Sequence, residues 1–364
     1  MPTVGRADEL LRLKAHCLSV GIQLTEAATW RLSCGGEVPL TVHEYATTGG
    51  VTFRIDDVFV NAPFDEWFCH ESRARLDVNG DRFEVHFDDA VFPCEMLPLP
   101  GYLDRTNHLG HRVTDTTMSH CDRIRVSPIT GCSLDCGFCD FPALRYVRHG
   151  ADEVLASLDV AKSDENLPAR HLLISGGSPG PKHFEWFDST LTDIIASSGL
   201  PTDVMMSPRE GGTDHVRRFA DAGAQSFSLN LEVFGDHRSG DVMPLKHRRS
   251  TPYLAETIRA AVDSVGSDGR VRSLVIVGLD EPADTLAALR FLAELGCEPV
   301  LSPFRPARNT RLAMWKPPAE NLLIDVYGAA ADIVAACGLK LGPRCIPCQH
   351  NTLVIPQGIG YYYT

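Results

Sequence analysis

The sequence predicts an α/β protein whose largest part is a partial (β/α)6 barrel. Three observations support this fold class. Short β-rich runs alternate with helical stretches from residue 119 to residue 303, which is typical of parallel βαβ units. Polar motifs follow the ends of these runs, where α/β barrels bind their ligands. With 364 residues, 44% of them hydrophobic, the chain is also long enough for two or three domains.

The first 115 residues are expected to form a small N-terminal α+β cap. Apolar residues from 7 to 32 are spaced roughly as in a helix, and residues 51–60 and 75–87 then alternate apolar and polar side chains as strands do. The dipeptide Asn79-Gly80 is a strong signal for a hairpin turn. Residues 93–110, rich in Pro, Gly and Leu, are interpreted as the linker that leaves the cap.

Residues 116–310 are assigned to the barrel. Its six strands are predicted at residues 123–128, 171–175, 203–207, 226–231, 272–277 and 299–302. The helices between the strands are predicted at residues 151–162, 184–197, 214–222, 252–265 and 284–295. The remaining residues, 311–364, are expected to form a C-terminal extension with a helix at 322–336.

Composition and charge limit the class of protein. The net charge of −13 argues against a nucleic acid partner, because binding a phosphate backbone requires a basic surface. The first nine residues lack the apolar stretch of a signal peptide, and no eighteen consecutive residues are apolar. Twelve cysteines are too few for a secreted disulfide scaffold in a chain of this length. We therefore expect a cytoplasmic protein with reduced thiols and no membrane association.

The most informative motif is a group of three cysteines, Cys132, Cys136 and Cys139, in the spacing C-x3-C-x2-C. Three thiolates on one short loop can hold a [4Fe-4S] cluster and leave one iron without a protein ligand. The same residues could instead be half of a zinc site or a chance cluster, although zinc sites usually use paired C-x2-C knuckles. The spacing favours the iron–sulfur cluster.

The aromatic residue Phe138, directly before Cys139, completes a motif that resembles the signature of the radical S-adenosylmethionine (SAM) superfamily. This resemblance implies that SAM binds the open iron. It also implies that an electron from the cluster cleaves SAM to a 5′-deoxyadenosyl radical, which removes a hydrogen atom from a substrate. A reductant such as flavodoxin or ferredoxin is the partner that the resemblance implies.

Further segments resemble the SAM-binding elements of that family, in the family's order. Gly176 and Gly177 resemble its Gly-Gly-Glu element, whose backbone holds the SAM amino group, with Ser178 in place of the glutamate. Asn230 and Glu232 resemble the ribose-binding Asn-x-Asp strand of biotin synthase. Taken alone, the glycines could simply make a βα turn, and Glu232 could be an ordinary polar residue of the barrel.

Two more pairs complete the expected SAM site. Ser207 and Arg209 follow a predicted strand, and an Arg donor fork suits the SAM carboxylate or the ribose. Val277 and Gly278 lie in a segment, residues 273–281, that resembles the adenine-binding strand of biotin and lipoyl synthases. A buried parallel strand that ends in glycine would have the same sequence without any ligand.

A second cysteine group lies near the C-terminus. Cys345 and Cys348 form a C-x2-C motif ahead of an expected two-strand hairpin, which resembles the auxiliary-cluster segment of the molybdenum-cofactor enzyme that rearranges guanosine triphosphate. The third cysteine of that segment is missing here, and Cys337 is the nearest replacement. The resemblance implies a second [4Fe-4S] cluster on Cys337, Cys345 and Cys348, with Cys121 as the reserve ligand. Alternatively, Cys345 and Cys348 form a redox pair or half a zinc knuckle, and Cys337 is a buried helix thiol.

The other cysteines are interpreted as packing residues, and no catalytic side chain is assigned. Arg305 and Arg308 follow the last predicted strand and favour an anionic small-molecule substrate, although they could belong to a solvated loop. We expect insertion of sulfur from the auxiliary cluster. The alternatives are radical rearrangement, lyase or dehydrogenation chemistry with the cluster as an anchor, and a non-catalytic iron–sulfur carrier or scaffold.

Overall fold

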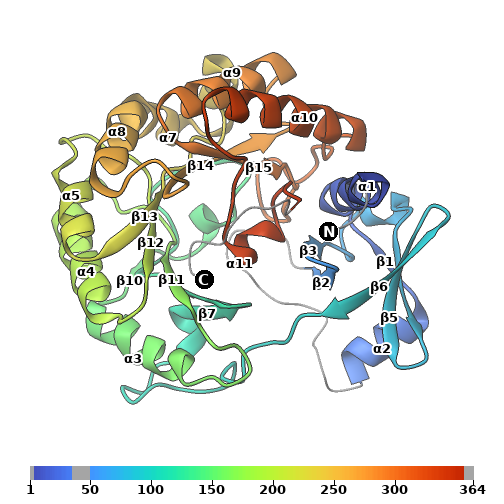
Figure 1. Cartoon of the computed structure of the whole chain (residues 1–364). Helices are drawn as coiled ribbons and strands as arrows, with labels where there is room; N and C mark the ends of the chain where they lie inside the picture. The colour runs from blue at the N-terminus through green and yellow to red at the C-terminus, as the bar shows by residue number, and fades with distance from the viewer. Residues whose placement is uncertain (1–3, 35–49, 356–364) are drawn as a thin grey trace.

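The computed structural model describes residues 4–34 and 50–355. Figure 1 shows a large curled sheet with helices around its outer face, and a smaller sheet beside it. The large sheet has seven strands in the order β15-β14-β13-β12-β11-β8-β7. No helix within the described ranges is long and apolar enough to cross a membrane.

Six of the seven strands are parallel, and they confirm the predicted partial (β/α)6 barrel. They are β8 (Arg123–Val126), β11 (His171–Ile174), β12 (Thr202–Met205), β13 (Ala224–Ser228), β14 (Val271–Val277) and β15 (Glu298–Pro303). The seventh strand, β7 (Thr117–His120), was not predicted and pairs antiparallel with β8. Each of the six lies within about two residues of its predicted start, because apolar β-rich runs mark buried strands clearly.

Helices pack on the outer face of this sheet and bury the main hydrophobic core between the two layers. The predicted ones are α3 (Ala151–Lys162), α4 (Phe184–Ser197), α5 (Asp214–Asp221), α8 (Leu254–Val265), α9 (Pro282–Glu294) and α10 (Glu320–Ala336). Two short helices after β13 were not predicted: α6 (Asp236–Val242) and α7 (Pro244–Arg249). They are too short to show a helical period in the sequence.

Short elements complete the barrel region. A two-stranded ribbon follows β8 and is made of β9 (Ile129–Thr130) and β10 (Val147–Arg148). Single 3-10 turns occur here at η2 (Val113–Asp115), η3 (Phe141–Ala143), η4 (Pro181–His183) and η5 (Thr251–Tyr253), and a further one, η1 (Cys69–Glu71), lies in the N-terminal region. The ribbon joins the two ends of the loop that carries the first three cysteines.

The smaller sheet has the order β1-β4-β5-β6-β2-β3 and its own hydrophobic core. Its strands are β1 (Gln23–Leu24), β2 (Val51–Ile55), β3 (Val58–Ala62), β4 (Arg75–Asn79), β5 (Arg82–Phe87) and β6 (Ala90–Met96). Asn79 pairs with Arg82, so the hairpin turn is Gly80-Asp81, one residue later than predicted. The stretch 51–60 is two strands with a turn at Asp56, which has a φ of 54°.

Two expectations for this region were wrong. The single helical stretch at residues 7–32 is two helices, α1 (Val4–Val20) and α2 (Glu26–Cys34). They separate at Gly21, where φ is 78° and a side chain would overlap the carbonyl group of Pro63. The expected linker begins only after Met96, because Pro93 lies inside β6. Proline fits there because β2 pairs only with Glu95 and Met96 of that strand.

The C-terminal segment runs along the inner side of the curled sheet. It contains the short helix α11 (Ile346–Gln349), which Figure 1 shows inside the curl. Residues 350–355 form no strand, so the described part of the expected hairpin was wrong, and its remaining part lies outside the described residues. Backbone hydrogen bonds hold the segment: Leu353 donates to Leu301, 2.8 Å, and Asn61 donates to His350, 2.9 Å.

A buried lysine on α1 fixes the same segment. The ammonium group of Lys14 has no exposed surface and donates to the carbonyl oxygens of Gln349 and Val354, each at 2.8 Å. Burial lowers the pKa of Lys14 to about 7. The first helix is therefore connected directly to the segment that carries Cys345 and Cys348.

We expect Lys14→Met to destabilise the protein by about 1–3 kcal/mol, because two buried carbonyl oxygens lose their donor. Urea unfolding gives the change, and hydrogen exchange should increase selectively in residues 345–355. Lys340→Met, at an exposed position, serves as the control. Unchanged exchange in that segment would show that Lys14 does not anchor it.

Candidate functional site

A cavity of about 680 Å³ lies inside the curl of the large sheet. Its size is within the range of roughly 300–1,000 Å³ usual for small-molecule sites. Because all six parallel strands point the same way, the loops at their carboxyl ends meet at one edge of this cavity. The sequence-predicted residues that line it are Cys132, Cys136, Phe138, Cys139, Gly176, Gly177, Ser178, Ser207, Arg209, Asn230, Glu232, Arg305 and Cys348.

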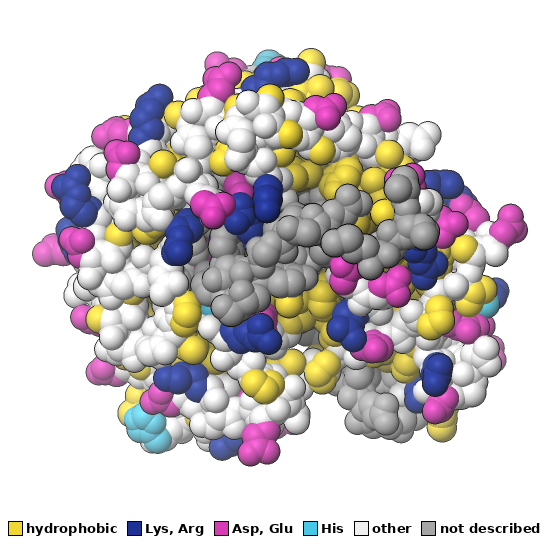
Figure 2. Space-filling model, in the orientation of Figure 1, with side chains coloured by type: hydrophobic (Ala, Val, Ile, Leu, Met, Phe, Trp, Pro, Cys, Tyr) yellow, Lys and Arg dark blue, Asp and Glu magenta, His cyan; other side chains and the backbone are white. Residues whose placement is uncertain are grey.

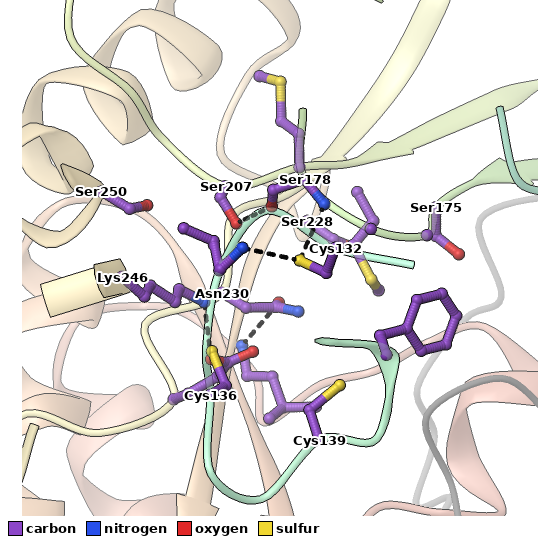
Figure 3. A pocket seen from close by; sticks show the side chains of 18 of the residues that line it. Cys132, Cys136, Cys139, Ser175, Ser178, Ser207, Ser228, Asn230, Lys246 and Ser250 are labelled. Carbon is purple, nitrogen blue, oxygen red and sulfur yellow. Dashed lines mark hydrogen bonds and ion pairs between the residues drawn. The ribbon is translucent and has the colours of Figure 1, made fainter. Parts of the chain in front are cut away.

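The three-cysteine loop, which we define as residues 131–140, follows β8 and β9. It is held on both sides by backbone hydrogen bonds, from Ser133 to Ser178 at 3.1 Å and from Gly137 to Val242 at 2.6 Å. The backbone N–H of Ser178 also donates to the sulfur of Cys132, 3.2 Å away. Figure 3 shows the three cysteines around this loop, close to Asn230 and Lys246. The loop is thus fixed to two neighbouring elements of the cavity wall.

The thiols of this loop are partly buried. Burial raises the pKa of Cys139 to about 12 and raises the pKa of Cys136 well above its usual value. No three His, Cys, Asp or Glu side chains within residues 4–34 and 50–355 are gathered as a metal site. The donor set nevertheless fits a cluster with one open iron, because three thiols lie on one short loop. Metal binding would draw them together and release their protons.

The glycine pair packs directly against the three-cysteine loop. A side chain at Gly177 would overlap the carbonyl group of Gly131 and lie 3.0 Å from Cα of Cys132. Gly176 has a φ of 137°, and its side chain would lie 2.6 Å from Oγ of Ser127. The glycines therefore set the position of the cysteines as well as the path of the chain after β11.

Ser207 and Arg209 follow β12, as predicted, and both line the cavity, but their partners differ. Oγ of Ser178 donates to Oγ of Ser207, 2.9 Å away, so these hydroxyls bridge two loops. The guanidinium of Arg209 contacts both carboxylate oxygens of Asp188 at 2.7 Å and lies over the ring of Phe184. Asp188 thus already neutralises this cation.

Glu232 has a partner that the sequence analysis missed. Lys246 on α7 is 4% exposed, and its ammonium donates to Oε2 of Glu232 at 2.7 Å. Burial lowers the pKa of Lys246, but Glu232 together with the sulfurs of Cys136 and Cys132 outweighs burial, and the pKa is raised. Asn230 accepts a hydrogen bond from the backbone N–H of Leu274. The sequence marks Lys246 only as part of the short basic run 246–249, and its pairing with Glu232 was missed because α7 was not predicted.

Three residues predicted to bind SAM or substrate lie outside the cavity lining. Side chains alternate along β14, so Leu274 and Ile276 line the cavity and Val277 does not. Gly278 packs against Pro318, where a side chain would lie 2.8 Å from the proline ring. Arg308 is an exposed residue whose Nε donates to Glu66 at 2.9 Å. Only Arg305 of the two expected substrate ligands borders the cavity, and it contacts Asn61 and Asn351 there.

The second cysteine group lies at the other end of the strands. The sulfurs of Cys345 and Cys348 are 3.2 Å apart. Arg123, the first residue of β8, donates to Cys348 at 3.0 Å, and Nε2 of His171, the first residue of β11, is 3.2 Å from Cys345. Cys337 is exposed at the end of α10 and does not join them in a metal-binding group.

The two sulfurs of this pair differ in acidity. Burial raises the pKa of Cys345 well above its usual value, and the hydrogen bond between the two sulfurs acts in the same direction. The hydrogen bond with Cys345 lowers the pKa of Cys348 well below its usual value, and Arg123 and Arg272 act in the same direction. Cys121 lies in the turn between β7 and β8, and buried cysteines away from both groups are Cys17, Cys69 and Cys297.

The charge of the cavity wall is opposite to that of the chain. Two acidic side chains line the cavity, Glu210 and Glu232, whereas the basic ones are Arg123, Arg125, Arg209, Lys246, Arg248, Arg249, Arg272 and Arg305. Figure 2 shows Lys and Arg side chains around the centre of this face. Two further lining hydroxyls, those of Ser228 and Ser250, are buried without a hydrogen-bond partner among the described residues. The wall is suited to a polar ligand with negative charge.

We expect Gly177→Ala to lower both iron uptake and SAM binding severalfold, because the new methyl group displaces the three-cysteine loop. Gly180→Ala is the matched control, since its methyl group would make an ordinary contact, 3.8 Å from Ser133. Iron content after anaerobic reconstitution and calorimetric SAM affinity provide the measurement. Equal iron content and equal SAM affinity in the two variants would show that Gly177 does not position the three-cysteine loop.

Residues 126–293 match the Radical SAM superfamily model. The chain is 23% identical over 249 residues to a probable dual-specificity RNA methyltransferase RlmN from Flavobacterium psychrophilum, a match that covers 62% of this chain and 70% of the relative. It is also 23% identical over 254 residues to a biotin synthase from Zymomonas mobilis, covering 67% and 74%.

Among solved structures, the chain resembles the FeFe-hydrogenase maturase HydG from Carboxydothermus hydrogenoformans, with a TM-score of 0.48 and 14% identity. That match covers 62% of this chain, and it spans little more than half, 55%, of the maturase. The family match covers β11 to β14, the three-cysteine loop and the glycine pair. The chain therefore carries a radical SAM domain.

Proposed function

We propose that this enzyme holds a [4Fe-4S] cluster and SAM at the carboxyl ends of its strands and removes a hydrogen atom from a small anionic molecule. One observation carries the proposal: a single cavity is lined by the three-cysteine loop, by the glycine pair and by a predominantly basic wall. The family implies the cluster and SAM. The substrate class is inferred from the wall.

Residues of this chain supply complementary groups for each part of SAM. Cys132, Cys136 and Cys139 would hold the cluster, which when bound supplies the electron that cleaves SAM to a 5′-deoxyadenosyl radical. Backbone groups of the glycine pair and of Ser178 suit the amino group. Lys246 and Glu232, a buried ion pair in the wall, offer a cation for the carboxylate and an acceptor for the ribose.

The remaining basic residues support an anionic substrate. Arg125 on β8 and Arg305 after β15 line the cavity and bring positive charge to its wall, which favours a ligand with a carboxylate or phosphate group. A nucleic acid is less consistent with the chain, because its net charge is −13 and the basic residues line a cavity instead of an open surface. A reduced carrier such as flavodoxin or ferredoxin would supply the electron.

The combined change of Cys132, Cys136 and Cys139 to Ala should abolish formation of 5′-deoxyadenosine from SAM under anaerobic reducing conditions. The reason is that no thiolate is left on the loop to hold the cluster. Liquid chromatography with mass spectrometry measures the product, and Cys337→Ala, at an exposed position, is the control. Product formation by the triple variant would contradict the role of this loop. No product from the reconstituted wild type would contradict an enzymatic role.

Sulfur insertion is a second candidate for the step after hydrogen removal. It is favoured by the position of Cys348, which lines the same cavity as the three-cysteine loop. A cluster on three cysteines is less well supported, because Cys337 is exposed at the end of α10 whereas Cys345 is buried. Rearrangement, lyase or dehydrogenation chemistry requires no sulfur donor and is therefore the alternative outcome.

Isotope labelling can distinguish these chemistries. The protein is reconstituted with iron and heavy-isotope sulfide and is incubated with SAM, a reductant and an extract of anionic metabolites. Sulfur insertion predicts labelled sulfur in a new small molecule, limited to about one turnover per chain if a cluster is consumed. A sulfur-free product formed over many turnovers would exclude insertion.

A further inference from the structure

We propose that Cys345 and Cys348 are a redox-active dithiol that closes to a disulfide within the reaction cavity. This inference goes beyond the proposed SAM chemistry and does not depend on it. Three observations about the pair support it: the distance between the sulfurs, the groups that surround them, and the access from the cavity.

The two sulfurs are already neighbours. They lie 3.2 Å apart and share a hydrogen bond, and the backbone N–H of Cys348 donates to the carbonyl oxygen of Cys345. The turn of α11 thus places both side chains on the same side of the chain. Closing a disulfide would require the sulfurs to approach by little more than 1 Å, since an S–S bond is about 2.05 Å long.

The groups around the pair suit an anionic sulfur better than a metal ion. The guanidinium of Arg123 donates to Cys348 at 3.0 Å, and a cation in this position would repel a metal cation. The second neighbour is His171, at 3.2 Å from Cys345, and no third cysteine or carboxylate completes a metal site among the described residues. A thiolate beside a cation is the usual arrangement of a reactive cysteine.

Access to the pair is one-sided. Cys348 lines the cavity and is partly exposed, whereas Cys345 is 3% exposed and does not line it. A reagent in the cavity therefore meets Cys348 first, and Cys345 can reach only Cys348. This order matches the attacking and resolving cysteines of a thiol–disulfide exchange site.

The exchange balances with a small anionic disulfide such as oxidised glutathione, which the basic wall would attract. The Cys348 thiolate attacks one glutathione sulfur, the glutathione S–S bond breaks, and one glutathione thiolate leaves and takes up a proton. Cys345 then loses its proton and attacks Cys348, which expels the second glutathione. The two cysteines are oxidised by two electrons, and one disulfide becomes two thiols.

The test uses the full chain, once without metal and once after anaerobic reconstitution with iron and sulfide. Each preparation is equilibrated with mixtures of reduced and oxidised glutathione and quenched with N-ethylmaleimide, and the Cys345–Cys348 peptide is analysed by mass spectrometry. We expect the disulfide to replace the two alkylated thiols at the same glutathione ratio in both preparations. Cys337→Ser is the matched control and should behave as wild type.

Single variants test the order of the two cysteines. Cys345→Ser should accumulate a glutathione adduct on Cys348, whereas Cys348→Ser should lose the reaction, because Cys345 does not line the cavity. Two results would overturn the proposal. One is the absence of the disulfide at every ratio of reduced to oxidised glutathione. The other is that reconstitution with iron and sulfide protects both thiols from oxidation and each variant loses about half of the iron, which would make the two cysteines cluster ligands.

Discussion

The packing of Gly177 against the carbonyl group of Gly131 is the constraint on which the site depends. It brings the loop after β11 into contact with the three-cysteine loop after β8, and the bonds that Ser178 makes with Ser133 and Cys132 continue that contact. Neither loop is a regular element, so their positions derive from this contact and not from a helix or strand. The positions of the cysteines, of the glycine pair and of Ser133 and Ser178 therefore depend on one another.

The barrel was predictable from the sequence because its signals are local. Apolar runs placed all six parallel strands, and α3 and α4 have the bounds that were expected. The failures have local causes as well: α6, α7 and α11 are too short to show a period, and Gly21 divides a stretch whose apolar spacing is continuous. Assigning each loop to the strand that precedes it was enough to place the first three cysteines at the cavity.

The contacts between distant segments could not be predicted in this way. Lys246 reaches Glu232, and Arg123 reaches Cys348 across 225 residues, and nothing in either segment alone indicates these partners. The motif order identified Asn230 and Glu232 but could not show that Glu232 is already paired. The direction of alternate side chains along β14 was also needed to show that Ile276, and not Val277, faces the cavity. Family motifs thus identified loops, and three-dimensional packing assigned individual side chains within them.

The attachment of Lys14 to Gln349 and Val354 has a consequence for how the chain folds. The two hydrogen bonds join residues 335 and 340 positions apart, so they can form only after every strand of the barrel has been synthesised. Contacts of such long sequence separation carry a high entropic cost of loop closure and are typical of slow folding steps. During synthesis the inner side of the curled sheet is therefore left uncovered by this segment until α11 has emerged.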